Sequence, residues 1–103
     1  MYKVQFLPLA KNDLIETVRY IANDLYNKQA AYKLADEIIK ATDTLADFPY
    51  AYPAYIPIRQ TKNEYRKISI QNYLVFYTVD EKNKIVTISR IVYAKRNYNK
   101  LIK

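Results

Sequence analysis

The sequence predicts an α+β fold in which a helical hairpin covers one face of an antiparallel sheet. Three stretches between Glu64 and Lys100 are rich in β-branched and aromatic residues, which favours strands. Connections of two to four residues join them, so neighbouring strands are expected to form antiparallel hairpins. Ahead of them, Lys11–Tyr26 and Lys28–Asp47 carry apolar residues at helical spacing, and Tyr2–Leu7 alternates like a short strand. The predicted order is strand, two helices and a three-stranded meander, in one domain that spans residues 1–103.

The two predicted helices each present one apolar face. Pro8 ends the first strand, and the first helix carries its apolar residues at Leu14, Val18, Ile21, Ala22 and Leu25. Asn27 is expected to cap the second helix. The apolar face of that helix consists of Ala31, Leu34, Ala35, Ile38, Ala41 and Leu45. Its small alanines let two helices approach closely, which predicts an antiparallel pair. The first strand should then join the sheet beside one of the later strands.

The stretch Phe48–Ile58 leads from the helices to the meander. It contains three prolines among tyrosines, which predicts an extended and stiff crossing segment. In the first hairpin, Asn72 is expected to take a left-handed backbone, because the chain has no glycine. The strand Tyr73–Val79 is apolar on both alternating sets of side chains, so it is expected in the centre of the sheet. The helices would cover one of its faces, and the C-terminal tail or a partner chain the other.

Composition excludes several kinds of chemistry. The chain has no cysteine, so it forms no disulfide and offers no thiolate. It also has no histidine, which is the commonest general base and metal ligand. We therefore expect no metal and no other cofactor. No apolar run approaches the length of a membrane span and no secretory signal is visible, so a cytoplasmic protein with no membrane partner is expected.

Positive charge is concentrated in the second half of the chain. Residues 1–58 carry six Lys/Arg and seven Asp/Glu, whereas residues 59–103 carry eleven Lys/Arg and three Asp/Glu. Such a one-sided field attracts a polyanion or an acidic protein segment. The alternative is that the excess charge serves only solubility.

Five motifs in this order resemble the RelE/ParE superfamily of bacterial type II toxins. They are LAKNDL at 9–14, LADFP at 45–49, YRKI at 65–68, NYLVFYTV at 72–79 and IVYAKRNY at 91–98. The Leu-x-x-Phe-Pro helix end and the Tyr-Ala-Lys-Arg-Asn-Tyr tail are closer to the ParE side. The resemblance implies a toxin that arrests growth and is neutralised by a cognate antitoxin, which typically wraps an acidic segment around it. ParE-like members inhibit DNA gyrase, whereas RelE-like members cleave mRNA on the ribosome.

The resemblance also allows the RelE-type catalytic positions to be compared with this sequence. Lys67 matches a basic position and Arg96 matches the arginine after the last strand, while Tyr98 lies near the tail tyrosine. Ser69 stands where a second lysine is wanted, and Leu74 stands where RelE-type members carry an arginine. RNA cleavage needs a base, an acid and cations around the phosphate. Two expected cations are absent, which favours the ParE-like reading, although Arg59, Lys62, Arg66 or Arg90 could compensate. A nucleic-acid-binding domain without toxicity is a weaker third alternative.

Six further residues are candidates for binding the target or a nucleic acid: Arg59, Lys62, Arg66, Arg90, Tyr93 and Lys95. The alternation of side chains along a strand predicts that Lys67 faces away from the helices if Ile68 packs on them. Structural roles are the alternatives: an ion pair of Arg66 with Asp13 or Glu16, and a pairing or snorkelling role for Arg90. The tyrosines at 50–55 are expected to hold their segment to the sheet, or alternatively to line an antitoxin groove.

Overall fold

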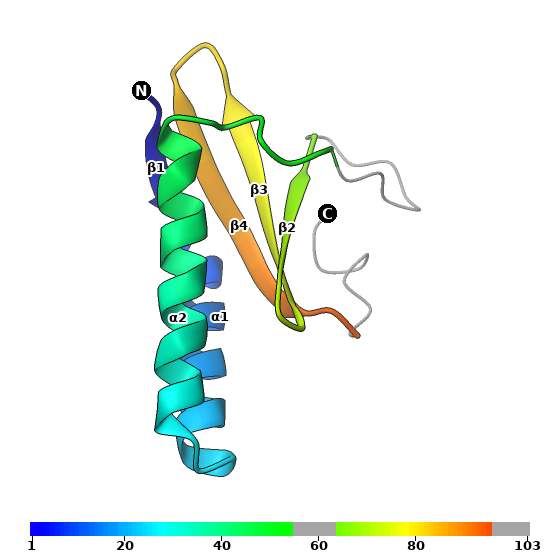
Figure 1. The fold of residues 1–103 in the computed structure, drawn as a ribbon. Helices are drawn as coiled ribbons and strands as arrows, with labels where there is room; N and C mark the ends of the chain where they lie inside the picture. The colour runs from blue at the N-terminus through cyan, green and yellow to red at the C-terminus, as the bar shows by residue number, and fades with distance from the viewer. Residues whose placement is uncertain (55–63, 96–103) are drawn as a thin grey trace.

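The structure is a computed structural model that describes residues 1–54 and 64–95 (Figure 1). Its elements are β1 (Lys3–Phe6), α1 (Pro8–Arg19), a π-helical turn (Tyr20–Asp24), α2 (Lys28–Asp43), a 3-10 turn (Thr44–Ala46), β2 (Arg66–Ile70), β3 (Tyr73–Asp80) and β4 (Ile85–Tyr93). The four strands form one sheet in the order β1-β4-β3-β2. The helices lie along one side of this sheet, and the tip of their hairpin extends beyond the end of the sheet (Figure 1). The predicted α+β class and element order are confirmed.

The first strand joins the sheet beside β4 and runs parallel to it, whereas the other strand pairs are antiparallel as predicted. The ladder ends where the Leu7 amide donates to the Ile88 carbonyl at 2.9 Å. α1 then begins at Pro8 rather than at Lys11, because proline is well tolerated at the first helical position. The edge of β4 beyond Ile88 is therefore left without a neighbouring strand among the described residues.

The helical faces follow the predicted pattern with one exception. The Asn27 side chain accepts a hydrogen bond from the Ala30 amide at 3.0 Å, so the predicted cap is confirmed. Leu34 and Ile38 on α2 are fully buried. Leu25, however, is 54% exposed. The reason is that Leu25 follows the π-helical turn at the tip of the helical hairpin, which extends beyond the end of the sheet (Figure 1).

The two hairpins obtain their tight turns without glycine. In the β2–β3 hairpin the left-handed residue is Gln71, with φ of 53°, so the expectation for Asn72 is wrong. A two-residue loop of either favoured type requires a positive φ at its first central position, which Gln71 occupies. The β3–β4 turn places Lys84 at φ of 56°. The Asp80 side chain supports this turn by accepting hydrogen bonds from the backbone and side-chain nitrogens of Asn83.

β3 is buried on both faces, as predicted. Val75 and Tyr77 belong to the main core between the sheet and the helices. On the other face, Phe76 and Leu74 form a second cluster with Tyr65 and Val92. The predicted covers of this second face include the C-terminal tail, whose residues 96–103 lie outside the described parts of the chain.

Contacts of Tyr77 and Arg66, among others, hold the beginning of the proline-rich segment to the sheet. The fully buried Tyr77 hydroxyl donates to the Pro49 carbonyl at 2.9 Å. Arg66 donates to the Tyr52 carbonyl at 2.6 Å and lies 4.8 Å from the centre of the Tyr50 ring. The predicted anchoring role of these two tyrosines is confirmed, while Tyr55 lies outside the described residues. The extended conformation is wrong at the start of the segment, because the Ala51 amide donates back to the Phe48 carbonyl and closes a turn.

Alkaline pH is expected to destabilise this fold partly through Tyr77. Burial raises the pKa of Tyr77 above the ordinary value of 10.0. The resulting stability is fully present below about pH 10 and is lost as the pH rises through the raised pKa, because only the neutral hydroxyl can donate to Pro49. Urea unfolding at about pH 8 and about pH 11 should show a smaller pH-dependent loss for Tyr77→Phe than for the original chain. An equal loss in both proteins would assign the sensitivity to other tyrosines.

Candidate functional site

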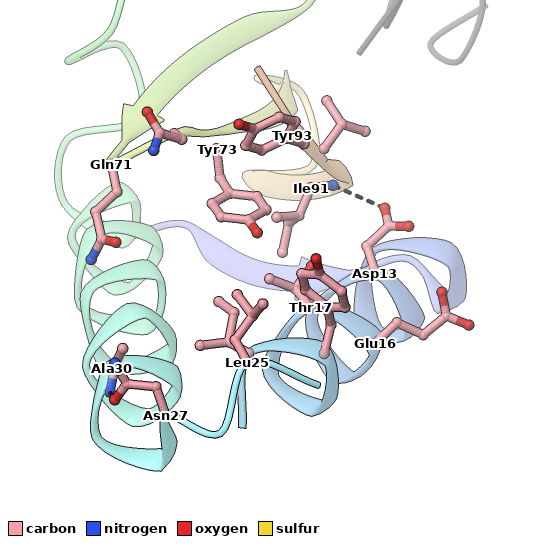
Figure 2. A pocket seen from close by; sticks show the side chains of 14 residues that line it. Asp13, Glu16, Thr17, Leu25, Asn27, Ala30, Gln71, Tyr73, Ile91 and Tyr93 are labelled. Carbon is pink, nitrogen blue, oxygen red and sulfur yellow. Dashed lines mark hydrogen bonds between the residues drawn. The ribbon is translucent and has the colours of Figure 1, made fainter. Parts of the chain in front are cut away.

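A groove of about 730 Å³ lies where the helical hairpin extends beyond the sheet (Figure 2). The end of α1, the π-helical turn and the start of α2 form one wall, and the β2–β3 turn with the end of β4 forms the other. Its apolar lining includes Ile21, Leu25 and Ile91. The exposed side chain of Leu25 lines this groove and is available to a partner. A groove with apolar walls suits an apolar segment of another molecule.

The α1 side of the groove is fixed by Asp13. Its carboxylate accepts two hydrogen bonds from the Arg90 guanidinium, at 2.8 and 3.0 Å, and a third from the Ile91 amide at 2.9 Å. Asp13 and Arg90 side chains are only 12% and 15% exposed. The Asp13 carboxylate thus occupies the edge of β4 just beyond the end of β1, and it supplies the acceptor that a longer β1 would have supplied. The contact with Asp13 raises the pKa of Arg90, which stays charged.

An irregularity in the sheet places Arg90 opposite Phe76, on the face away from the main core, and the Arg90 guanidinium reaches Asp13 of α1 from there. The ladder pairs Phe76 with Arg90 but Tyr77 with Ile88, so Ser89 is an extra residue on β4. Such a bulge redirects the side chains that follow it. Here it allows both Ile88 and Ile91 to enter the main core, which a strictly alternating strand would forbid.

The sheet side of the groove carries an aromatic corner formed by Tyr73 and Tyr93. Their ring centres are 5.6 Å apart and their planes meet at 64°. Tyr73 is half-buried and Tyr93 is 40% exposed, so both rings can contact a bound molecule (Figure 2). Burial raises the pKa of Tyr73, with smaller contributions from the nearby hydroxyls of Tyr93 and Tyr20. All three tyrosines line the groove.

The candidate cations that the structure describes, Arg66, Lys67, Arg90 and Lys95, do not line this groove. Lys67 pairs across the ladder with Phe76, so it lies on the face away from the helices as predicted. Arg66 binds Glu64 at 2.9 Å, so the predicted pairing with a helix carboxylate is wrong for Arg66 and is made by Arg90 instead. Lys95 is exposed just after β4, and Tyr93 lies in the groove. Arg59, Lys62, Arg96 and Tyr98 lie outside the described residues, and the functional roles of all these residues remain predictions.

Part of the positive charge of the second half of the chain is paired with carboxylates within residues 1–54 and 64–95. These parts hold twelve of the 17 Lys/Arg and all ten Asp/Glu, so five of the seven net positive charges belong to residues 55–63 and 96–103. Arg66 and Arg90 have carboxylate partners, and Lys84 binds Glu81 at 3.1 Å. The described parts therefore carry two of the seven net positive charges, and the expected attraction of an anionic partner stays a prediction.

Residues 1–54 and 64–95 contain no group of three or more His, Cys, Asp or Glu side chains placed to hold a metal ion. In the same residues, no helix is both long and apolar enough to cross a membrane.

Comparison with known proteins decides the family. The sequence model of the ParE toxin of type II toxin–antitoxin systems, parDE, matches residues 4–98, which is most of the chain. The chain belongs to the ParE toxin family. The match confirms the resemblance of this ParE-family toxin to the RelE/ParE superfamily, which its motifs suggest. A search of curated proteins gave no significant match.

Solved structures share the fold of this ParE-family toxin at low sequence identity. The chromosomal ParDE system from P. aeruginosa contains a chain of 16% identity with a TM-score of 0.70, and the match covers 92% of this chain and 98% of that one. The RelBE2 complex from Mycobacterium tuberculosis gives 17% identity, a TM-score of 0.64 and coverage of 89% and 96%. The E. coli RelBE complex contains a chain of 15% identity with a TM-score of 0.57, and the match covers 93% of this chain and 100% of that one. The fold is therefore shared by toxins of both the ParE and the RelE type.

Sequence reasoning missed most of the residues that form the groove in this ParE-family toxin. Leu25 was assigned to the core, and Tyr73 was treated only as part of a central strand. Local spacing carries no signal for the groove, because the extension of the hairpin past the sheet depends on how helices and strands are offset along one another (Figure 1). Glu16 was considered only as a possible partner of Arg66, whereas it lies at the α1 rim of the groove (Figure 2).

Proposed function

We propose that this chain arrests growth by binding and inhibiting DNA gyrase, and that a cognate antitoxin neutralises it. The observation that carries the proposal is the match to the ParE family over residues 4–98. The ParE-like helix end at 45–49 and the tail at 93–98 support it further.

The outer face of the sheet supports binding over RNA cleavage. Leu74, at the position where the RelE resemblance implies an arginine, is 6% exposed and packs in an apolar cluster with Phe76. A cation at this position would be buried in apolar surroundings without a carboxylate partner, which carries a large desolvation penalty. Lys67 lies on the same face, so a single expected cation is present there among the described residues. Crowded phosphate charge at the transition state requires more than one such group.

An antitoxin partner is supported by the shared fold and by the groove. The similar chains come from RelBE complexes of M. tuberculosis and E. coli and from a ParDE system of P. aeruginosa. The groove offers apolar surface from Ile21, Leu25 and Ile91 that a partner segment would bury. Its volume of about 730 Å³ is sufficient for several side chains.

A gyrase assay tests the proposed target. Purified toxin is expected to abolish supercoiling of relaxed plasmid by DNA gyrase, and addition of the adjacent gene's product is expected to restore it. In cells, induction should cause an SOS response while mRNA stays intact by primer extension. Lys67→Ala combined with Arg96→Ala should leave this toxicity within about twofold, because neither residue performs chemistry in a binding inhibitor.

The runner-up is a ribosome-dependent mRNA endoribonuclease of RelE type, supported by Lys67 and Arg96 at matching positions. It predicts breaks at the ribosomal A site, unaffected gyrase, and loss of toxicity in the double variant by about 100-fold, as expected when catalytic groups are removed. That set of results would overturn the gyrase proposal.

A further inference from the structure

The groove differs in charge from the rest of this basic protein. The charged residues among those that line it are Asp13 and Glu16, and no Lys or Arg is among them. Asp13 is already bound by Arg90 and the Ile91 amide. Glu16 is exposed at the rim and makes no ion pair or hydrogen bond with the described residues. The α1 rim of the groove therefore carries one negative charge without an ion-pair partner among the described residues, on the opposite side from Tyr73 and Tyr93 (Figure 2).

Elsewhere in residues 1–54 and 64–95, a tyrosine ring, a glutamate and a cation come together at Arg66 and at Lys84. Arg66 lies 4.8 Å from the centre of the Tyr50 ring and binds Glu64. Lys84 lies 5.0 Å from the centre of the Tyr2 ring and binds Glu81. Both arrangements use the attraction of a cation to the face of an aromatic ring.

The groove offers the same kinds of group without the cation. Tyr73 and Tyr93 present two ring faces at a large angle, and Glu16 lies across the groove on α1 (Figure 2). Two angled rings surround a cation better than one, because each contributes the negative electrostatic potential of its face. No described Lys or Arg lies over either ring of this corner.

We infer that the groove binds an antitoxin segment that inserts a lysine or arginine side chain against Tyr73 and Tyr93, with flanking apolar side chains on Leu25 and Ile91. This inference rests on the proposed antitoxin partner and specifies which part of it the groove selects. The groove would then take a basic and apolar segment of the antitoxin. Glu16 disfavours an acidic side chain at the same place, which gives the groove selectivity between partners.

Binding of the adjacent gene's product to the full toxin tests this inference by biolayer interferometry. Tyr93→Leu, which keeps apolar bulk but removes the ring face, should weaken binding by about tenfold, whereas Tyr93→Phe should stay within about twofold. Tyr32→Leu is the matched control, because Tyr32 is an exposed tyrosine on α2 that does not line the groove. Glu16→Lys should weaken binding by about fivefold, mainly through slower association, and Asp43→Lys, outside the groove, should not.

A double-mutant cycle identifies the inserted side chain. Each Lys and Arg of the adjacent gene's product is changed to Met in turn and measured against the original toxin and Tyr93→Leu. One of these changes should weaken binding to the original toxin but have no further effect on Tyr93→Leu.

These experiments distinguish failure of the antitoxin partner from failure of the inserted basic side chain. Strong binding that neither Tyr93→Leu nor Glu16→Lys affects, or a cycle without coupling, would overturn the inference and leave the antitoxin partner in place. Absence of binding to the original toxin would overturn the antitoxin partner and this inference with it. A dimer of the toxin alone that Tyr93→Leu dissociates would assign the groove to a second copy of the chain, and would also overturn the inference.

Discussion

Replacing Asp13 with alanine is expected to lower the free energy of unfolding by about 3–4 kcal/mol. The change leaves the largely buried Arg90 guanidinium without its carboxylate and the Ile91 amide without an acceptor. An uncompensated buried charge is far more costly than a lost surface pair. Urea denaturation followed by circular dichroism would measure the effect. The matched control is Asp36→Ala, which breaks an exposed helical pair with Lys40 and should cost about 0.5 kcal/mol or less.

Two companion variants separate the charge of Asp13 from its hydrogen bonds. Asp13→Asn keeps an acceptor for the Ile91 amide, so it should lose about half as much stability as the alanine variant. Combining Asp13→Leu with Arg90→Met removes both charges and should be less destabilising than Asp13→Ala. If Asp13→Ala lost no more than about 1 kcal/mol, the contact would be an ordinary surface pair and its role at the edge of β4 would be wrong.

Tyr77→Ala is expected to have a comparable effect, with a loss of about 4 kcal/mol. The ring is fully buried in the main core, and its removal leaves a cavity under the proline-rich segment. Tyr77→Phe keeps the ring and loses only the hydrogen bond to the Pro49 carbonyl, so it should cost about 1 kcal/mol. Thermal and urea unfolding of both variants give the comparison.

The exposed Tyr32 provides the control for this pair of variants. Tyr32→Ala on α2 should stay within about 0.5 kcal/mol of the original chain, because it removes little buried surface. If Tyr77→Phe were as damaging as Tyr77→Ala, the hydrogen bond to Pro49 rather than core packing would dominate. If both variants were near neutral, Tyr77 would not connect the segment after α2 to the sheet.

The Asp13 contact also links stability to the groove. Asp13 binds β4 at Ile91, and Ile91 is itself part of the groove lining. The wall of α1 is therefore fixed relative to the sheet before any partner binds. A preformed groove saves the entropy of ordering its walls on binding, which strengthens association.

The sequence by itself determined the elements, their order, most of the helical faces and the superfamily. These follow from local patterns: the buried Leu34 and Ile38 recur at helical spacing, and Asn27 caps the helix that begins beside it. The outward direction of Lys67 follows from strand alternation in the same way. Local patterns suffice here because each depends on residues within a few positions of one another.

The tertiary structure alone decided the partner of Arg90, the exposure of Leu25 and the groove that Leu25 lines. Asp13 and Arg90 are 77 positions apart, and their contact depends on where β1 ends and on the extra residue in β4. Leu25 fits the apolar pattern of a core residue, and only the extension of the helical hairpin past the sheet exposes it. Periodicity tells which side of an element is apolar, but contacts between distant segments depend on the relative lengths and register of elements, which no local pattern contains.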